Sequence, residues 1–128
     1  MHPLHAFLLL LPLLFLPLSG GIVSAADAAA PLRVALLLET PLGDHGWNDS
    51  LAAGLERAKQ KLSVRTSIIT ATPGGNAADL QEMFRKAARE NDLVLVASDR
   101  LHEILRDNAA NFRRTMFGCI DAGIRAPN

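Results

Sequence analysis

The chain has 128 residues, and its 13 basic and 13 acidic side chains balance to a formal net charge of zero. A balanced charge gives no electrostatic footprint for nucleic acid or for an anionic membrane surface, so neither is expected as a direct partner. The length sets one compact domain as the natural ceiling, and the only cysteine, Cys119, excludes a disulfide within the chain.

Residues 1–26 are expected to lie outside the folded domain. Residues 6–18 are nearly all Leu, Phe and Pro, which is typical of a signal-peptide core and too short for a membrane span of about 20 apolar residues. Small residues at 23–25, or alternatively at 24–26, fit a cleavage site. We therefore predict an exported protein, with an uncleaved anchor as the alternative because the leader has no Lys or Arg. No cysteine lies near the cleavage site, which argues against a lipoprotein.

After residue 27 the hydrophobic period alternates between strand and helix. Residues 32–38 are a nearly continuous apolar run, which is typical of a parallel strand buried on both faces. The same reasoning predicts further strands at 64–69, 93–97 and 115–120 and helices at 48–62 and 77–90. A third helix is expected to begin at a cap on Ser98 or Asp99 and to carry Leu101, Ile104, Leu105 and Phe112.

The alternating order of strands and helices indicates the fold class. It predicts an α/β domain over residues 27–128, a doubly wound parallel sheet with helices on both faces and right-handed crossovers. A mature chain of this length buries only a modest core.

Polar residues follow three of the four predicted strands. In open α/β sheets, ligands bind at the carboxyl ends of the strands, so these residues predict a polar-ligand site. The Pro73-Gly74-Gly75-Asn76 loop joins the same edge. The candidate ligand-binding residues are Asp44, Gly46, Trp47, Asn48, Ser98, Asp99 and Asp121.

Each candidate also has a structural interpretation. Asp44 is suited to complement a helix dipole, Asn48 to cap the helix, and Asp121 to sit in a turn. Trp47 fits either a stacking ring or a core residue, and Gly46 suggests a positive φ angle or a close backbone approach.

The remaining reactive side chains predict no chemistry of their own. His45 and His102 lack the short spacing of a metal site, so we expect solvated histidines, no metal and no cofactor. Cys119 lies inside the fourth apolar run and is expected to behave as a small buried hydrophobe.

Three segments carry a resemblance to a known family. The run 34–38 with the loop Asp44-His45-Gly46-Trp47-Asn48, the helix containing Gly54, and the strand end Phe117-Gly118-Cys119-Ile120-Asp121 resemble the basic membrane protein family. Members are substrate-binding proteins of ABC importers, and the chain is similar to the purine nucleoside receptor lipoproteins among them. The resemblance spans residues 33–128.

The resemblance implies a single Rossmann-like lobe of a type I periplasmic binding protein, with the second lobe absent. Asp44 and Asn48 would then contact a nucleoside, and Asp121 would bind ribose hydroxyls. Trp47 replaces the usual phenylalanine as an aromatic wall, and Gly46 replaces a serine and loses its contact. The turn Ser98-Asp99 would border a pocket that, with one lobe, is only a shallow face.

The expected function is that of an exported, non-enzymatic solute-binding protein, or a fragment of one, in the periplasm or another extracytoplasmic space. Its expected partners are a nucleoside-like small molecule and an ABC permease, with membrane contact only through the permease or an uncleaved signal segment. One alternative is a degenerate or partner-dependent α/β module that binds no ligand alone. A further alternative is a small periplasmic hydrolase using Asp44, His45 or Asp99, although no nucleophile–base constellation accompanies them.

Overall fold

The computed structural model describes residues 30–121, so the predicted signal peptide (residues 1–26) lies outside the described residues. None of the helices in this range has the length and apolarity needed to cross a membrane. The elements, in chain order, are β1 (Leu32–Leu38), α1 (Trp47–Lys61), β2 (Val64–Thr70), α2 (Ala77–Glu90), β3 (Leu93–Val96), α3 (Asp99–Asn108), the 3₁₀ turn η1 (Ala109–Asn111) and β4 (Met116–Cys119).

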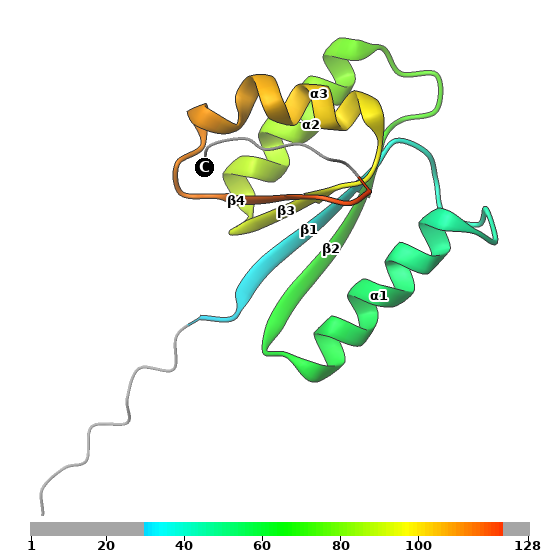
Figure 1. Cartoon of the computed structure of the whole chain (residues 1–128), viewed down its shortest axis with the longest axis vertical. Helices are drawn as coiled ribbons and strands as arrows, with labels where there is room; N and C mark the ends of the chain where they lie inside the picture. The colour runs from blue at the N-terminus through cyan, green and yellow to red at the C-terminus, as the bar shows by residue number, and fades with distance from the viewer. Residues whose placement is uncertain (1–29, 122–128) are drawn as a thin grey trace, which may run out of the picture.

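The four strands form one fully parallel sheet in the order β2-β1-β3-β4. Leu36, near the middle of β1, has Ile68 as its register partner on β2 and Leu95 as its partner on β3. Helix α1 lies on one face of the sheet, and α2 and α3 lie on the other (Figure 1). The predicted doubly wound α/β fold is therefore confirmed.

The core has two parts because successive residues of a strand face opposite sides of the sheet. On the side of α2 and α3, Ala35 and Leu37 of β1 pack with Phe84 and Leu101. On the side of α1, the buried cluster is smaller and consists of Val34, Leu36, Leu38 and Leu55.

The third helix is shorter than its apolar stripe predicted. It ends at Asn108, whose side-chain Nδ2 donates to the carbonyl of Ile104 at 2.8 Å, and η1 follows. Phe112 was expected on this helix, but it lies beyond the end of the helix. Instead its ring lies edge-on to Phe84 and Phe117, with centroid distances of 6.0 and 6.5 Å.

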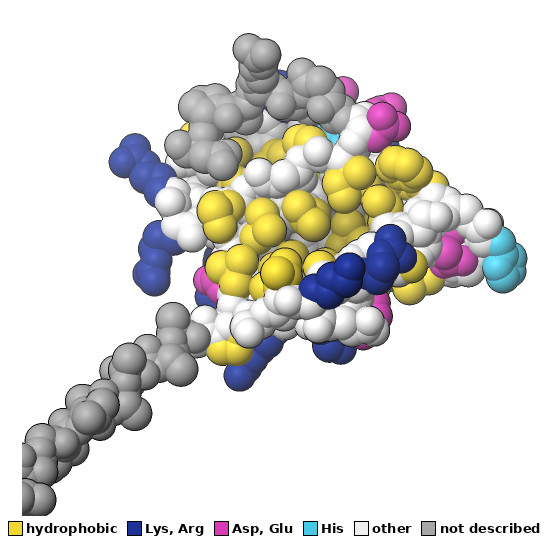
Figure 2. All heavy atoms as spheres, turned by 60° about the horizontal axis from the view of Figure 1, so that its bottom comes forward, with side chains coloured by type: hydrophobic (Ala, Val, Ile, Leu, Met, Phe, Trp, Pro, Cys, Tyr) yellow, Lys and Arg dark blue, Asp and Glu magenta, His cyan; other side chains and the backbone are white. Residues whose placement is uncertain are grey.

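The face of the sheet that carries α1 is only partly covered. Helix α1 packs against β1 and β2, and no described helix lies over the same face of β3 and β4. Figure 2 shows a continuous group of hydrophobic side chains on this side of the molecule. We call it the open face, and by strand alternation and packing it includes Leu93, Leu95, Met116 and Ile120.

Candidate functional site

The carboxyl ends of the four strands define the candidate site. Because all strands are parallel, the segments after β1, β3 and β4 leave the sheet at one edge, as the sequence predicted. Strand order places β2 on one side of β1 and β3 on the other. This arrangement puts the topological switch point, where open α/β sheets bind ligands, between β1 and β3.

Asp44 holds the entry to α1. Its carboxylate accepts hydrogen bonds from the backbone N–H groups of Gly46, Asn48 and Asp49 at 3.0, 2.9 and 3.2 Å. N–H groups at the start of a helix have no partner within the helix. The N-cap residue, Gly46, has no side chain to accept them, so the side chain of Asp44, two residues earlier, caps α1 instead. The bonds from Asn48 and Gly46 lower the pKa of Asp44, which keeps the carboxylate charged.

Asn48 is buried and fastens the β1–α1 loop to the helix. Its Nδ2 donates to the Thr40 carbonyl at 3.1 Å, to Thr40 Oγ1 at 2.8 Å and to the Pro41 carbonyl at 3.1 Å. The amide nitrogen is thus committed to the loop that forms one rim of the edge.

Gly46 shows neither the positive φ angle nor the close backbone approach that the sequence suggests for it. Gly46 has a φ of −145°, and a Cβ there would meet its nearest neighbour, the Asp44 carbonyl, at an ordinary 3.6 Å. The positive φ angles fall instead on Gly43 (+97°) and His45 (+50°). Asp49 stabilises that turn by accepting the backbone N–H groups of both residues, at 2.8 and 3.0 Å.

Trp47 is the first residue of α1 and stays 48% exposed. It is therefore not the core tryptophan of the alternative interpretation. An exposed indole at the ligand edge of an α/β sheet offers a flat apolar surface for stacking.

The other predicted site residues lie at the same edge but make only local contacts. Ser98 caps α3 by accepting the Leu101 N–H at 3.4 Å, and the side chain of the next residue, Asp99, is fully exposed. Asp121 is exposed and has a positive φ of +60°. Among residues 30–121, no hydrogen bond or ion pair joins these three residues to the Asp44–Asn48 loop.

The two histidines differ in burial. His45 is exposed, as expected. His102 is buried, contrary to our expectation, because it widens the apolar stripe of α3 beyond Leu101 and Leu105. Within the described residues its Nε2 has no hydrogen-bond partner, and no group of three or more His, Cys, Asp or Glu could hold a metal ion.

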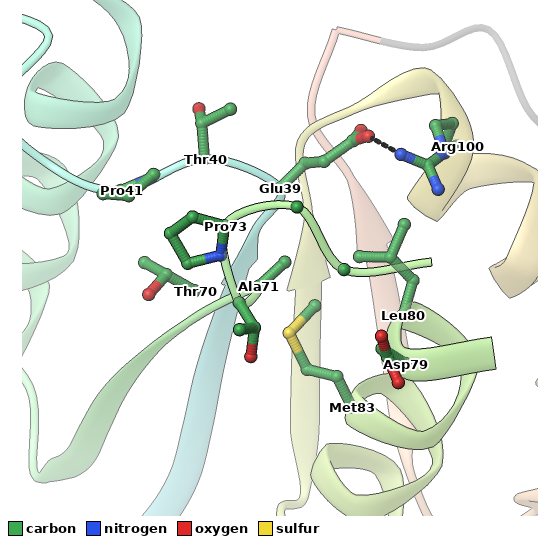
Figure 3. Close-up of a pocket in the computed structure, with 13 residues that line it drawn as sticks. Glu39, Thr40, Pro41, Thr70, Ala71, Pro73, Asp79, Leu80, Met83 and Arg100 are labelled. Atoms are coloured by element: carbon green, nitrogen blue, oxygen red, sulfur yellow. Dashed lines mark hydrogen bonds and ion pairs between the residues drawn. The ribbon is translucent and has the colours of Figure 1, made fainter. Parts of the chain in front are cut away.

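A cleft of about 440 Å³ opens between the β1–α1 and β2–α2 loops. Figure 3 shows Met83 of α2 beneath it and the carboxylate of Glu39 pointing toward the guanidinium of Arg100. This ion pair, 2.5 Å from Nη1 to Oε1, joins the end of β1 to the first turn of α3, across the switch point. The other lining residues are Thr40, Pro41, Thr70, Ala71, Thr72, Pro73, Gly74, Gly75, Asp79 and Leu80.

None of the seven candidate ligand-binding residues lines this cleft. The sequence reasoning placed the loop 73–76 at this edge, and three of its residues do line the cleft, but it missed Glu39, Arg100 and Asp79. Glu39 directly follows a strand buried on both faces, and that position alone is a usable signal for a ligand-edge residue. Arg100 carried no such signal, because a basic residue on an amphipathic helix is ordinarily a solvated one.

Comparison with known proteins identifies relatives of the whole described domain. The model of the Bmp family, described as ABC transporter substrate-binding protein PnrA-like, matches residues 32–128. The crystal structure of an ABC transporter system solute-binding protein from Aeropyrum pernix K1 superimposes with a TM-score of 0.66 at 28% identity. That match covers 74% of this chain and 26% of the other, so the chain spans about a quarter of that protein.

A second solved structure shares the fold. A putative lipoprotein (fragment) from Peptoclostridium difficile 630 superimposes with a TM-score of 0.64 at 19% identity, covering 76% of this chain and 80% of that one. No curated protein sequence matches the chain.

Proposed function

We propose, from the premise that this chain belongs to the Bmp family of PnrA-like ABC transporter substrate-binding proteins, that it supplies one wall of a solute site. Proteins of this family are extracytoplasmic and bind solutes rather than transform them. In the proposal, residues 1–26 direct export, residues 27–128 form the binding lobe, and an ABC permease receives the solute.

The observation that carries the proposal is the exposed Trp47 at the carboxyl edge of the sheet. An aromatic ring at that position suits a ligand with a flat face, and a purine nucleoside is such a ligand. The resemblance of the Asp44–Asn48 loop to nucleoside receptors supports the same class.

Acidic side chains at the same edge suit the hydroxyl groups of a sugar. Asp121 is exposed, and the charged carboxylate of Asp44 accepts three bonds, while an ionised carboxylate has about four acceptor positions. We therefore assign Asp44 and Asp121 to hydroxyl contacts. Ser98 and Asp99 border the site, and the backbone at Gly46 lies beside it.

Trp47 makes the proposal directly testable, because it is the only tryptophan in the chain. Titration with adenosine, guanosine or inosine is expected to change its fluorescence and to release heat in calorimetry. Trp47→Phe should retain calorimetric binding, whereas Trp47→Ala should weaken it by about tenfold, the order expected for a lost aromatic contact. No heat and no fluorescence change at millimolar nucleoside would refute binding by this lobe alone.

The open face favours a second candidate function, a module that works only with a partner. Exposed apolar surface of this kind marks interaction sites on soluble proteins. The two candidates differ in what the isolated chain does: the first binds a small molecule as a monomer, and the second associates.

A further inference from the structure

The amino-terminal edge of the sheet, opposite the proposed solute site, holds a second cleft of about 360 Å³. Four arginines and one aspartate line it, so its local formal charge is +3 although the whole chain is neutral. In Figure 2, basic side chains project from the left edge of the view. The charged lining residues are Arg33, Arg89, Asp92, Arg113 and Arg114.

The arginines of this cleft are not equally engaged. Arg33 neutralises Asp92 through two side-chain contacts, from Nε at 3.1 Å and from Nη2 at 2.8 Å. Arg89 forms an ion pair with Glu82 of its own helix, with 2.9 Å between Nη2 and Oε1. Arg113 and Arg114 are exposed and form no ion pair with any described residue, although the charge of Arg114 helps Arg33 to lower the pKa of Asp92. Arg113 is therefore the cation of this cleft that is least engaged by a described carboxylate.

The backbone that carries these two arginines is well anchored. The Thr115 hydroxyl donates to the Ala88 carbonyl at 2.6 Å, and the Thr115 backbone N–H donates to the Phe112 carbonyl at 3.0 Å. The ring of Phe112 packs against Phe84 in the core. The turn that presents Arg113 and Arg114 is therefore fixed to both α2 and the core, which reduces the entropy lost when an anion binds.

We propose that this cleft binds a free, multivalent phosphate anion of the size of pyrophosphate. A guanidinium group presents paired N–H donors that match the oxygens of a phosphate. Binding of the anion becomes stronger when several guanidinium groups converge in one concave site. The cleft lies at the opposite end of the strands from the proposed solute site, so the inference stands independently of that function.

The test is calorimetry of the full chain with inorganic pyrophosphate at pH 8 and low salt. The double variant Arg113→Gln/Arg114→Gln is expected to lose affinity by at least about tenfold, as for charge-assisted hydrogen bonds. The control Lys59→Gln/Lys61→Gln removes the same charge from α1 and should leave the affinity unchanged. Circular dichroism melting of both variants establishes that they are folded.

Two further ligands distinguish a free phosphate anion from a carboxylate anion and from a lipid headgroup. Citrate and glycerophosphoglycerol, the soluble headgroup of a phospholipid, are expected to bind more weakly than pyrophosphate. Tighter binding of citrate would overturn the phosphate assignment, and equal or tighter binding of the diester would overturn the free anion in favour of a lipid. Absence of heat at millimolar pyrophosphate, or equal losses in both double variants, would overturn the site itself.

Discussion

Asn48 is a buried residue whose side chain fastens the β1–α1 loop. Its side-chain nitrogen donates to two carbonyls and a hydroxyl of the β1–α1 loop. Asn48→Ala leaves these acceptors without their shared donor and should lower the free energy of unfolding by about 1–3 kcal/mol. Urea denaturation followed by circular dichroism measures the change.

The matched control for Asn48 is Asn108→Ala. That side chain is only half-buried and makes one described bond, to the Ile104 carbonyl, so its loss should cost less than the loss of Asn48. Equal losses in the two variants would show that the three contacts of Asn48 do not hold the loop.

The ion pair between Arg33 and Asp92 predicts acid sensitivity. Contacts from the Arg33 side chain and backbone lower the pKa of Asp92 from 3.8 to about 2. A carboxyl whose pKa is lower in the folded state stabilises the fold above its unfolded pKa and loses that contribution as protonation proceeds. The melting temperature should therefore fall between pH 3.8 and about 2.

Arg33→Gln should make this acid-induced loss shallower, since only the backbone donor to Asp92 remains. Arg106→Gln is the comparison, because Arg106 pairs only with its chain neighbour Asp107 among the described residues. Melting curves recorded from pH 6 to pH 2 would contradict the prediction if parent and Arg33→Gln lost stability in parallel.

At the scale of the elements, two glycines predict opposite effects of the same substitution. Gly54 lies inside α1, where a Cβ would meet only Arg57 Nη2, at 3.7 Å. Gly54→Ala should raise the free energy of unfolding by about 0.5–1 kcal/mol, because glycine is a poor helix former. Thermal or urea denaturation would reveal the gain.

Gly75 precedes α2 in the loop that lines the cleft of about 440 Å³. A Cβ there would lie 2.9 Å from the Thr72 carbonyl oxygen and 3.2 Å from Asp79 Oδ2. Asp79 takes part in the capping box of α2, so Gly75→Ala should destabilise the loop and the helix start together. A stabilised Gly75→Ala protein, in the same denaturation experiment, would contradict this account.

Helices and strands were the part of the structure that sequence could predict. Residues 32–38 and 77–90 fold as expected, because an unbroken apolar run and a helical stripe each fit one kind of element. The end of α3 was not predictable, since the stripe continues to Phe112 while the side chain of Asn108 satisfies the Ile104 carbonyl at the helix end.

The site was less predictable than the elements. Parallel topology confirmed that the candidate loops share an edge, but local pattern does not distinguish a ligand carboxylate from a helix cap, as with Asp44. The burial of His102 and the pairing of Glu39 with Arg100 depend on how α3 sits on the sheet, which the sequence periodicity does not encode.

At the scale of the whole molecule, the open face predicts self-association. Light scattering after size-exclusion chromatography should show a mass that rises with concentration. Met116→Lys places a charge on this face at a residue that is already 51% exposed, so association should fall without loss of stability. Leu62→Lys, at a residue 60% exposed in the α1–β2 turn, is the control expected to behave as the parent.

A monomer at every concentration, or equal effects of the two lysine variants, would contradict a role of the open face. The nucleoside titration can be run on the same samples. A monomer that binds nucleoside favours the solute-binding proposal, and an associating chain without binding favours the partner-dependent module.

The position of β1 in the middle of the sheet also determines when this chain can fold. It precedes both of its partner strands, β2 and β3, in the chain, and its hydrogen bonds between Arg33 and Asp92 span 59 residues. Helix α1 can cover one apolar side of this strand, but the other side has nothing to pack against until α2 has been synthesised. The edge of β1 that pairs with β3 stays open until the segment through Val96 follows. The sheet can therefore close around β1 only after residues 32–96 have all been synthesised.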